Sequence, residues 1–135
     1  MNVATDSAPA IEALLRNYCA ALDARSDPAG VAATYWTGDG VLDNTAIGSP
    51  AVEGRVALAE AFTRMFATME LLDHRLSGFR LLSGDDDRAT AQAAVAAAGR
   101  PAGGETFAMS GRYRLEARRA NGGWKLARLT FTPAA

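Results

Sequence analysis

Apolar residues in the first half of the chain recur at three- and four-residue steps, the spacing of one face of an α-helix. The first such stripe comprises Ile11, Leu14, Leu15, Tyr18 and Leu22. We therefore predict a helix over about 7–25, capped by Asp6 or Ser7, with Pro9 in its first turn. A second, short helix is predicted to start at Pro28 and end around Trp36.

The middle of the chain is richer in turn-forming residues. Residues 37–40 read Thr-Gly-Asp-Gly and predict a turn, and residues 41–44 predict a short strand. Gly and Pro residues in 45–54 indicate a loop. A third helix is predicted over about 55–69 because apolar residues again fall on one face.

The second half changes to a period of two, which is typical of strands. We predict four strands at about 74–82, 88–98, 106–118 and 124–132. The strand over 88–98 has the weakest pattern, because alanine is a poor strand former and hides any alternation. Helices followed by an antiparallel meander predict an α+β fold. We expect a cone-shaped α+β barrel, with three N-terminal helices on the concave face of a curved, mainly antiparallel sheet and an apolar pocket between them.

Composition narrows the classes of function. The chain has 135 residues and a formal net charge of −1, which fits a single domain over 1–135 with a flexible N-terminus at 1–6. Arginines are scattered rather than clustered, so we expect no nucleic-acid partner, and no apolar run is long enough to span a membrane. The single cysteine, and an N-terminus without a signal-peptide pattern, favour a cytoplasmic protein. A small hydrophobic molecule is the expected ligand.

Three residues are candidates for chemistry. His74 is the only histidine, and imidazole suits acid–base work near neutral pH, although a surface histidine is the plainer alternative. Asp23 ends the first apolar stripe, where the negative end of the helix disfavours a carboxylate. A functional role therefore explains an aspartate at this position slightly better than a contribution to helix stability does. Tyr18 lies on the same stripe and either packs in the core or donates a hydrogen bond to a substrate oxygen.

Three short motifs, in this order and spacing, resemble a known family. They are the run Tyr-Cys-Ala-Ala-Leu-Asp at 18–23, Val-Glu-Gly at 52–54, and Gly-Gly-Trp at 122–124. Together with the order of elements, they resemble the SnoaL-like branch of the nuclear transport factor two-like superfamily. That fold hosts dehydratases, isomerases, polyketide cyclases, oxygenase subunits and non-catalytic binding modules, so the fold alone does not decide the function.

The resemblance implies roles for particular residues. In scytalone dehydratase and bile-acid dehydratase, an aspartate ending the first helix pairs with a histidine that starts the long strands, and Asp23 and His74 match these places. Tyr18 matches a tyrosine that stands five residues before the aspartate in the bile-acid enzyme. Scytalone dehydratase has a second histidine that this chain lacks, so Tyr113 is the expected substitute donor.

The ketosteroid isomerases of the superfamily place a carboxylate base on the strand after the second helix. Asp43 and Asn44 occupy that neighbourhood here, and because they are adjacent only one can point inward. We favour Asn44, since it would share the inward face with Leu42. The walls of the expected pocket are Trp36, Phe62, Phe66 and Met109, each of which has core packing as its plainer reading.

Two functions follow from these expectations. The first is a cofactor-independent lyase or isomerase (dehydratase, isomerase or cyclase type) for a hydrophobic cyclic or polyketide-like molecule, in which Asp23 and His74 form the acid–base pair. The second is a non-catalytic ligand-binding or interaction module. A small oxygenase subunit ranks third. One histidine and one cysteine are too few for a zinc site, so no metal or other cofactor is expected. We further expect a homodimer.

Overall fold

The computed structural model describes residues 3–121 and 123–134 of the chain. Its helices are α1 (Val3–Asp23), α2 (Pro28–Tyr35) and α3 (Arg55–Thr68), with a short 3₁₀ helix η1 at Thr45–Ile47. Its strands are β1 (Trp36–Asp43), β2 (Val52–Glu53), β3 (Met69–Gly84), β4 (Arg88–Pro101), β5 (Phe107–Ala120) and β6 (Gly123–Pro133).

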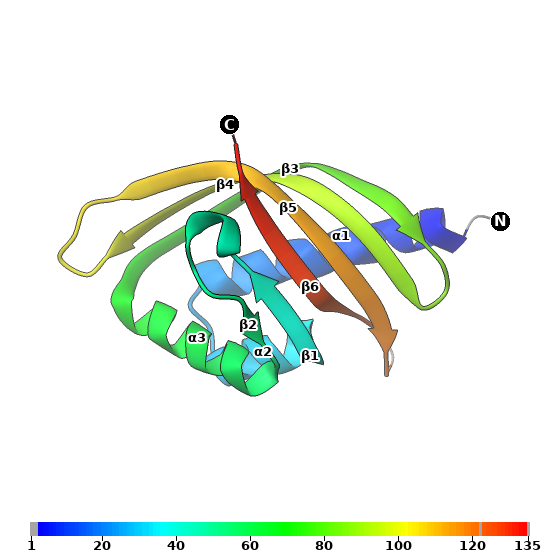
Figure 1. Ribbon diagram of the computed structural model, residues 1–135, viewed down its shortest axis with the longest axis horizontal. Coiled ribbons are helices and arrows are strands. Elements are labelled where there is room, and N and C mark those ends of the chain that lie inside the picture. Colours follow the sequence, from blue (N-terminus) through cyan, green and yellow to red (C-terminus); the bar gives the residue numbers. More distant parts are fainter. Residues whose placement is uncertain (1–2, 122, 135) are drawn as a thin grey trace.

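The strands form one mixed sheet in the order β2-β1-β6-β5-β4-β3. All neighbouring strands are antiparallel except β1 and β6, which run parallel. The sheet is curved and unclosed, and the three helices cover its concave side (Figure 1). α1 packs along β3, while α2 packs against α3. This confirms the predicted α+β arrangement of three helices on a curved, mostly antiparallel sheet.

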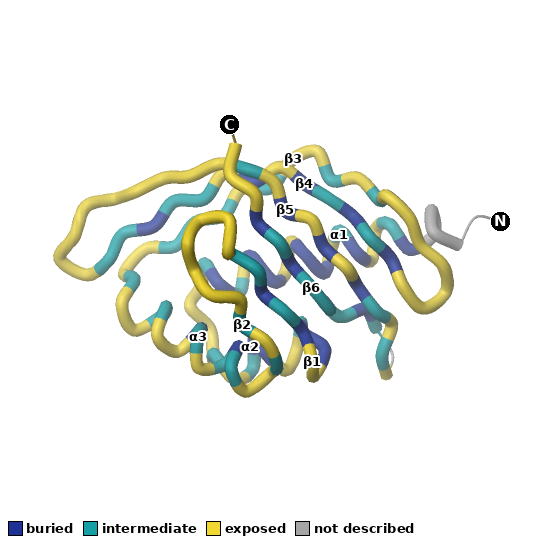
Figure 2. The backbone as a smooth tube through the Cα atoms, in the orientation of Figure 1, coloured by how far each residue is buried: buried dark blue, intermediate teal, exposed yellow. Residues whose placement is uncertain are grey.

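The core lies between the concave face of the sheet and the helices. Along the long strands, buried residues alternate with less buried ones (Figure 2). On β4 the buried residues are Ala89, Ala91, Ala93, Val95 and Gly99. Alternation is therefore present in the strand whose sequence did not reveal it, because alanine occupies positions on both faces. Burial of a residue on β4 depends on which face of the sheet its side chain points to. Hydropathy does not reveal this in a run of alanines.

Two predicted boundaries are wrong. Residues 37–40, predicted as a turn, belong to β1, which starts at Trp36. Pairing with β6 and an irregular register between Trp36 and Val41 accommodate these turn-forming residues in a strand. The strand also ends at Asp43, so it does not include Asn44.

The first helix begins earlier than predicted, at Val3, so Pro9 lies inside it rather than in its first turn. Ser7 is buried within the helix and is not its cap. Residues 3–6, part of the N-terminus expected to be flexible, form the start of α1, while residues 1–2 lie outside the described residues.

Gly54 joins the β1–β2 region to the third helix. It stands at the N-cap of α3 with a φ of 93°, a left-handed conformation that side chains rarely adopt. Its amide donates a 2.8 Å hydrogen bond to the carbonyl of Gly40, and its carbonyl accepts one from Leu58. The conformation of Gly54 thus sets the direction in which α3 crosses the concave face.

Candidate functional site

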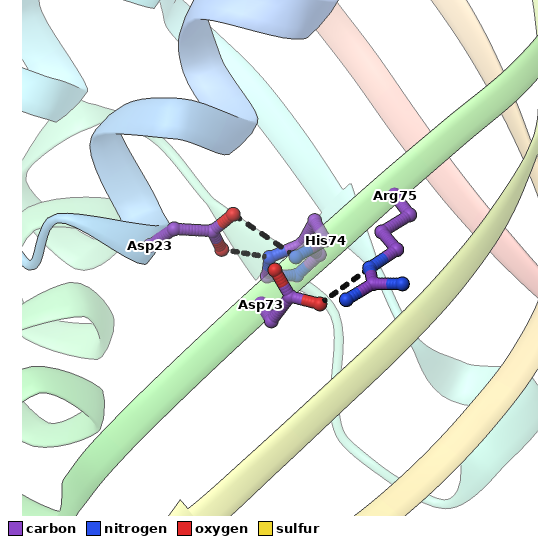
Figure 3. A network of polar contacts seen from close by, with 4 residues as sticks. All are labelled: Asp23, Asp73, His74 and Arg75. Carbon is purple, nitrogen blue, oxygen red and sulfur yellow. Dashed lines mark hydrogen bonds and ion pairs between the residues drawn. The ribbon is translucent and has the colours of Figure 1, made fainter.

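Asp23 and His74 meet where the end of α1 lies against β3 (Figure 3). The ring Nδ1 of His74 is 2.6 Å from Oδ1 of Asp23, and the backbone N–H of His74 donates to Oδ2 at 3.0 Å. Two residues further on, the Arg25 guanidinium donates to the carbonyl of Met69 at 2.7 Å, which also ties the end of α1 to β3. The predicted pair is therefore in direct contact.

The contact orients both partners. The two oxygens of Asp23 contact two different nitrogens of His74, so the carboxylate cannot turn without losing a contact. The His74 side chain is 11% exposed and that of Asp23 is 26% exposed. An ionised Asp23 favours the tautomer that carries its proton on Nδ1, which leaves Nε2 with a free lone pair. Among the described residues, Nε2 has no hydrogen-bond partner.

The residues beside His74 do not take part in this contact. Asp73 and Arg75 flank it on β3, and their side chains point to the opposite face of the sheet because strand residues alternate. They pair with each other at 3.0 Å, and both are well exposed (Figure 3). An exposed pair of this kind contributes little stability, so its role here is separate from the buried pair.

Tyr18 is buried in an aromatic cluster on the helix side of the sheet. Its ring meets that of Trp36 edge to face, with centroids 5.5 Å apart, and lies 6.1 Å from that of Phe62. Phe66 stacks on Phe62 at 6.3 Å and is half-buried. Three of the predicted wall residues (Trp36, Phe62 and Phe66) are thus brought together with Tyr18, although their packing also serves the core.

Several buried polar side chains surround the pair. Burial raises the pKa of Tyr18 well above its usual value, and the neighbouring Tyr113 and Cys19 add to this effect while the indole of Trp36 opposes it. The pKa of Tyr113 is raised by burial and then by the nearby Cys19 and Asp23. Both phenols are therefore neutral hydrogen-bond donors near neutral pH.

Tyr113 and Met109 lie on β5, on the same face of the strand. Tyr113 is buried and packs edge to face against Phe131 at 5.9 Å. Met109 pairs with Ala97 on β4, which pairs with His74 on β3, so Met109 and His74 belong to one row across the sheet. Met109 is 36% exposed, and so it borders the interior rather than filling it.

Asp43 and Asn44 are not brought to the pair. Asp43 accepts hydrogen bonds from the amide and hydroxyl of Thr45 and from Arg128 at 2.7 Å, and these contacts lower its pKa, the Thr45 hydroxyl most of all. Leu42 is buried, so its neighbour Asp43 faces the outer side of the sheet. Asn44 precedes η1, where its backbone carbonyl accepts from Ile47. The expectation that Asn44 sits in a strand beside Leu42 is wrong.

Two features of the interior were not predicted from the sequence. The buried indole N–H of Trp36 has no hydrogen-bond partner among the described residues. Cys19 is buried one helical turn before Asp23, and burial, with a smaller effect of Asp23, raises its pKa to about 12. Neither feature could be read from the residue pattern, since both depend on which way a buried side chain points.

Five surface hollows of about 400 to 680 Å³ mark the described part of the protein, and neither Asp23 nor His74 lines any of these five. Of these five, the one with the largest volume lies over polar residues that include Arg88, Glu116 and Arg128. Among the described residues there is no group of His, Cys, Asp and Glu side chains that could hold a metal ion. No helix in the described ranges is long and apolar enough to cross a membrane.

Comparison with known proteins places this geometry in context. The family model described as SnoaL-like domain matches residues 4–130. A protein of Novosphingobium aromaticivorans, to which an aromatic ring hydroxylase activity is ascribed, is 32% identical over 97% of this chain and 91% of its own, with a TM-score of 0.91. None of the curated proteins compared with the chain matches it.

Two further solved structures share the fold. A ketosteroid isomerase-like protein of Erwinia carotovora atroseptica is 26% identical over 96% of this chain and 97% of its own, with a TM-score of 0.77. A second Novosphingobium aromaticivorans protein, to which scytalone dehydratase activity is ascribed, is 20% identical over 94% of this chain and 83% of its own, with a TM-score of 0.84. At that identity the likeness shows the fold alone.

Proposed function

This chain belongs to the SnoaL-like domain family, and on that premise we propose that it is a cofactor-independent acid–base enzyme of the dehydratase or isomerase type. Its substrate is a small hydrophobic cyclic or polyketide-like molecule. The observation that carries the proposal is the contact between Asp23 and His74, at 2.6 Å between Oδ1 and Nδ1. Relatives of dehydratase and isomerase type with the same fold support the same general class of reaction.

The geometry suggests how the reaction proceeds. Nε2 of His74 removes a proton from the carbon next to a substrate carbonyl, and the electron pair moves to the carbonyl oxygen to form an enolate. Asp23 stabilises the imidazolium that results. Tyr18 and Tyr113 donate hydrogen bonds to the oxygen on which negative charge develops.

The second half of the reaction decides its class. In a dehydratase, the enolate collapses and the C–O bond at the neighbouring carbon breaks, while protonated His74 gives its proton to the leaving hydroxyl and water departs. In an isomerase, His74 returns the proton to a different carbon of the conjugated system. Both outcomes use one shuttled proton and leave the enzyme unchanged, so the same pair serves either.

The character of the interior supports an apolar, uncharged substrate. Phe62, Phe66 and Trp36 present aromatic surface, and the buried phenols of Tyr18 and Tyr113 are neutral donors. A charged molecule would lose its hydration there without gaining a buried counter-ion of comparable strength. We therefore propose that the substrate binds between the helices and the concave face, beside Nε2 of His74.

A panel of cyclic β-hydroxyketones provides the test. Dehydration would be followed as loss of water by mass spectrometry, and proton transfer as deuterium uptake next to the carbonyl in D₂O. We expect turnover of at least one compound, and a decrease of about 100-fold or more in His74→Gln with an unchanged circular dichroism spectrum. The control is Asp73→Asn, which changes a carboxylate beside His74 on the opposite face. Equal turnover by the wild type and His74→Gln would refute the proposal.

A second candidate is a non-catalytic binding module or a small subunit of a larger oxygenase. The 32% identity to the protein with an ascribed ring hydroxylase activity favours the oxygenase subunit. This reading predicts that His74→Gln leaves ligand or partner binding intact and that the protein alone shows no proton exchange on any ketone of the panel.

We also propose a cytoplasmic homodimer that pairs through the outer face of the sheet. Arg112, Arg114 and Glu116 are exposed there, and a two-fold axis lets the arginines of each copy meet Glu116 of the other. Light scattering after size exclusion would show a dimer for the wild type and a larger monomer fraction for Glu116→Arg.

A further inference from the structure

One of the five hollows lies between the first part of α1 and the adjoining ends of β5 and β6, and α2 completes its lining. Its volume is about 580 Å³, which is within the range of pockets that bind small molecules. The last residue of α1 that lines it is Asn17, six residues before Asp23. At the rise of an α-helix these two residues are about 9 Å apart. The hollow is therefore separate from the acid–base pair.

Aromatic and aliphatic side chains form much of the wall of this hollow. Trp124 is 8% exposed, and Tyr35 is half-buried, with its ring edge to face against that of Tyr18 at 6.1 Å. On α1, Ala13 and Leu14 add aliphatic surface. A flat apolar group placed against these residues would be removed from water and would gain contact with aromatic rings, both of which favour binding.

Arg119 carries the one charge among the described residues that line the hollow. It pairs with Trp124 across the β5–β6 ladder, and its Cζ lies 4.7 Å from the centroid of the Trp124 ring. Its Nε donates a 2.8 Å hydrogen bond to the carbonyl of Asp86. The guanidinium is thus held by a ring and by a backbone oxygen. Its two Nη atoms take no part in that hydrogen bond, so they can donate to a ligand.

The preceding residue, Arg118, is in a different situation. Its side chain points to the opposite face of β5, because strand residues alternate. There it donates to the carboxylate of Asp39 at 2.7 Å. In the described part of the chain, none of the ion pairs includes Arg119. The hollow therefore presents a fixed positive charge beside aromatic surface, which is complementary to an anion with a flat apolar body.

We propose that this hollow is a second ligand site and that it binds a small aromatic monocarboxylate. The carboxylate accepts hydrogen bonds from both Nη atoms of Arg119, in the two-pronged geometry that a guanidinium favours. The ring packs against Tyr35 and Trp124. One guanidinium balances one negative charge, so a monocarboxylate fits better than a dianion. This site is distinct from the proposed acid–base site and does not depend on it.

Three probes separate the charge from the ring: benzoate, its neutral counterpart benzamide, and acetate, which has the charge without the ring. The chain has two tryptophans, so ¹⁵N-tryptophan labelling gives two indole signals, which Trp124→Phe assigns. We expect benzoate to shift the Trp124 signal and to leave that of Trp36 in place. Benzamide should bind about tenfold or more weakly, as expected for the loss of charge-assisted hydrogen bonds. Acetate at the same concentration should shift neither signal.

Variants test the assigned residues. Arg119→Gln should weaken benzoate binding about tenfold or more, whereas the matched control Arg118→Gln should stay within about twofold of the wild type. Ala13→Phe keeps the charge and fills the hollow, so it should also weaken binding, and it serves if Arg119→Gln fails to fold. A Trp124 signal that benzoate leaves unchanged, equal losses in the two arginine variants, or full affinity in Ala13→Phe would overturn the proposal.

The proposed reaction and the second site fail separately. Benzoate binding is measured without turnover, and His74→Gln should bind benzoate as tightly as the wild type. A loss of affinity in His74→Gln would place benzoate beside the acid–base pair and would overturn the second site. If His74→Gln kept full turnover on the ketone panel while benzoate still shifted the Trp124 signal, the acid–base role alone would be wrong.

Discussion

Asp23 and Asp43 are two carboxylates at the ends of elements, one facing the interior and one facing the outer side of the sheet. Asp43 is held by Thr45 and by Arg128, which are donors that do not change protonation state near neutral pH. Asp23 is held by His74, a partner that can gain and release a proton. Both are well satisfied, yet only the interior one is coupled to a group that can do acid–base work.

The partner of a carboxylate, more than its position in the chain, indicates its role. Both residues were candidate bases on the sequence. Arg128 and the Asx-type turn to Thr45 make Asp43 a local anchor between β1 and η1. The imidazole of His74 makes Asp23 part of a proton-transfer unit.

The largest contrast should be seen in cysteine reactivity. Cys19 is buried beside the site, and a thiol with a pKa of about 12 has about a thousandfold less thiolate at neutral pH than one at the ordinary value of 9. We expect iodoacetamide to modify Cys19 about a thousandfold more slowly than a cysteine placed on the outer face by Ala96→Cys in a Cys19→Ala background. Mass spectrometry measures both rates. Similar rates would mean that the interior around α1 is open to water.

Activity should separate the two carboxylates by about two orders of magnitude. Asp23→Asn removes the charge that stabilises the imidazolium, and we expect turnover to fall about 100-fold or more on any substrate found for the wild type. Asp43→Asn should stay within about threefold, because Asp43 does not touch the pair. Initial rates at saturating substrate measure the effect. Equal losses in the two variants would remove the distinction drawn here.

The smallest effect concerns pH and stability. The pKa of Asp43 is lowered in the folded protein, so its contribution to stability is present above the unfolded value of about 4 and is lost as the pH falls through the folded value. We expect Asp43→Asn to melt slightly below the wild type at pH 7, with the gap closing below pH 4. Thermal melts across this range test it. A gap independent of pH would show that the ionised carboxylate does not matter.

The sequence predicted the fold better than it predicted local geometry. The helical stripe that ends at Asp23 and the period-two strands were enough for the α+β arrangement. The prediction of a turn at residues 37–40 was wrong because these turn-forming residues belong to β1, which pairs with β6. Strand pairing is a tertiary effect that local sequence does not show. The prediction for Asn44 was wrong because β1 ends at Asp43, one residue earlier than expected, and η1 follows.

The candidate site was predicted only through resemblance. Nothing in the spacing of Asp23 and His74, which are 51 residues apart, indicates contact, and the matching positions in the dehydratases supplied it. The orientation of the Trp36 indole could not be foreseen either, because neighbours such as Gly40 set the direction of its polar edge. Orientation inside a core depends on packing and not on pattern.

The proposed acid–base role requires Asp23 to hold the ring of His74 with the proton on Nδ1 and a free lone pair on Nε2. His74 is the only histidine, so ¹⁵N-histidine labelling gives one imidazole whose tautomer can be read by long-range ¹H–¹⁵N correlation at a pH where the ring is neutral. The account predicts the Nδ1–H tautomer in the wild type and a shift toward Nε2–H in Asp23→Asn. An Nε2–H tautomer in the wild type, or no change in the variant, would contradict it.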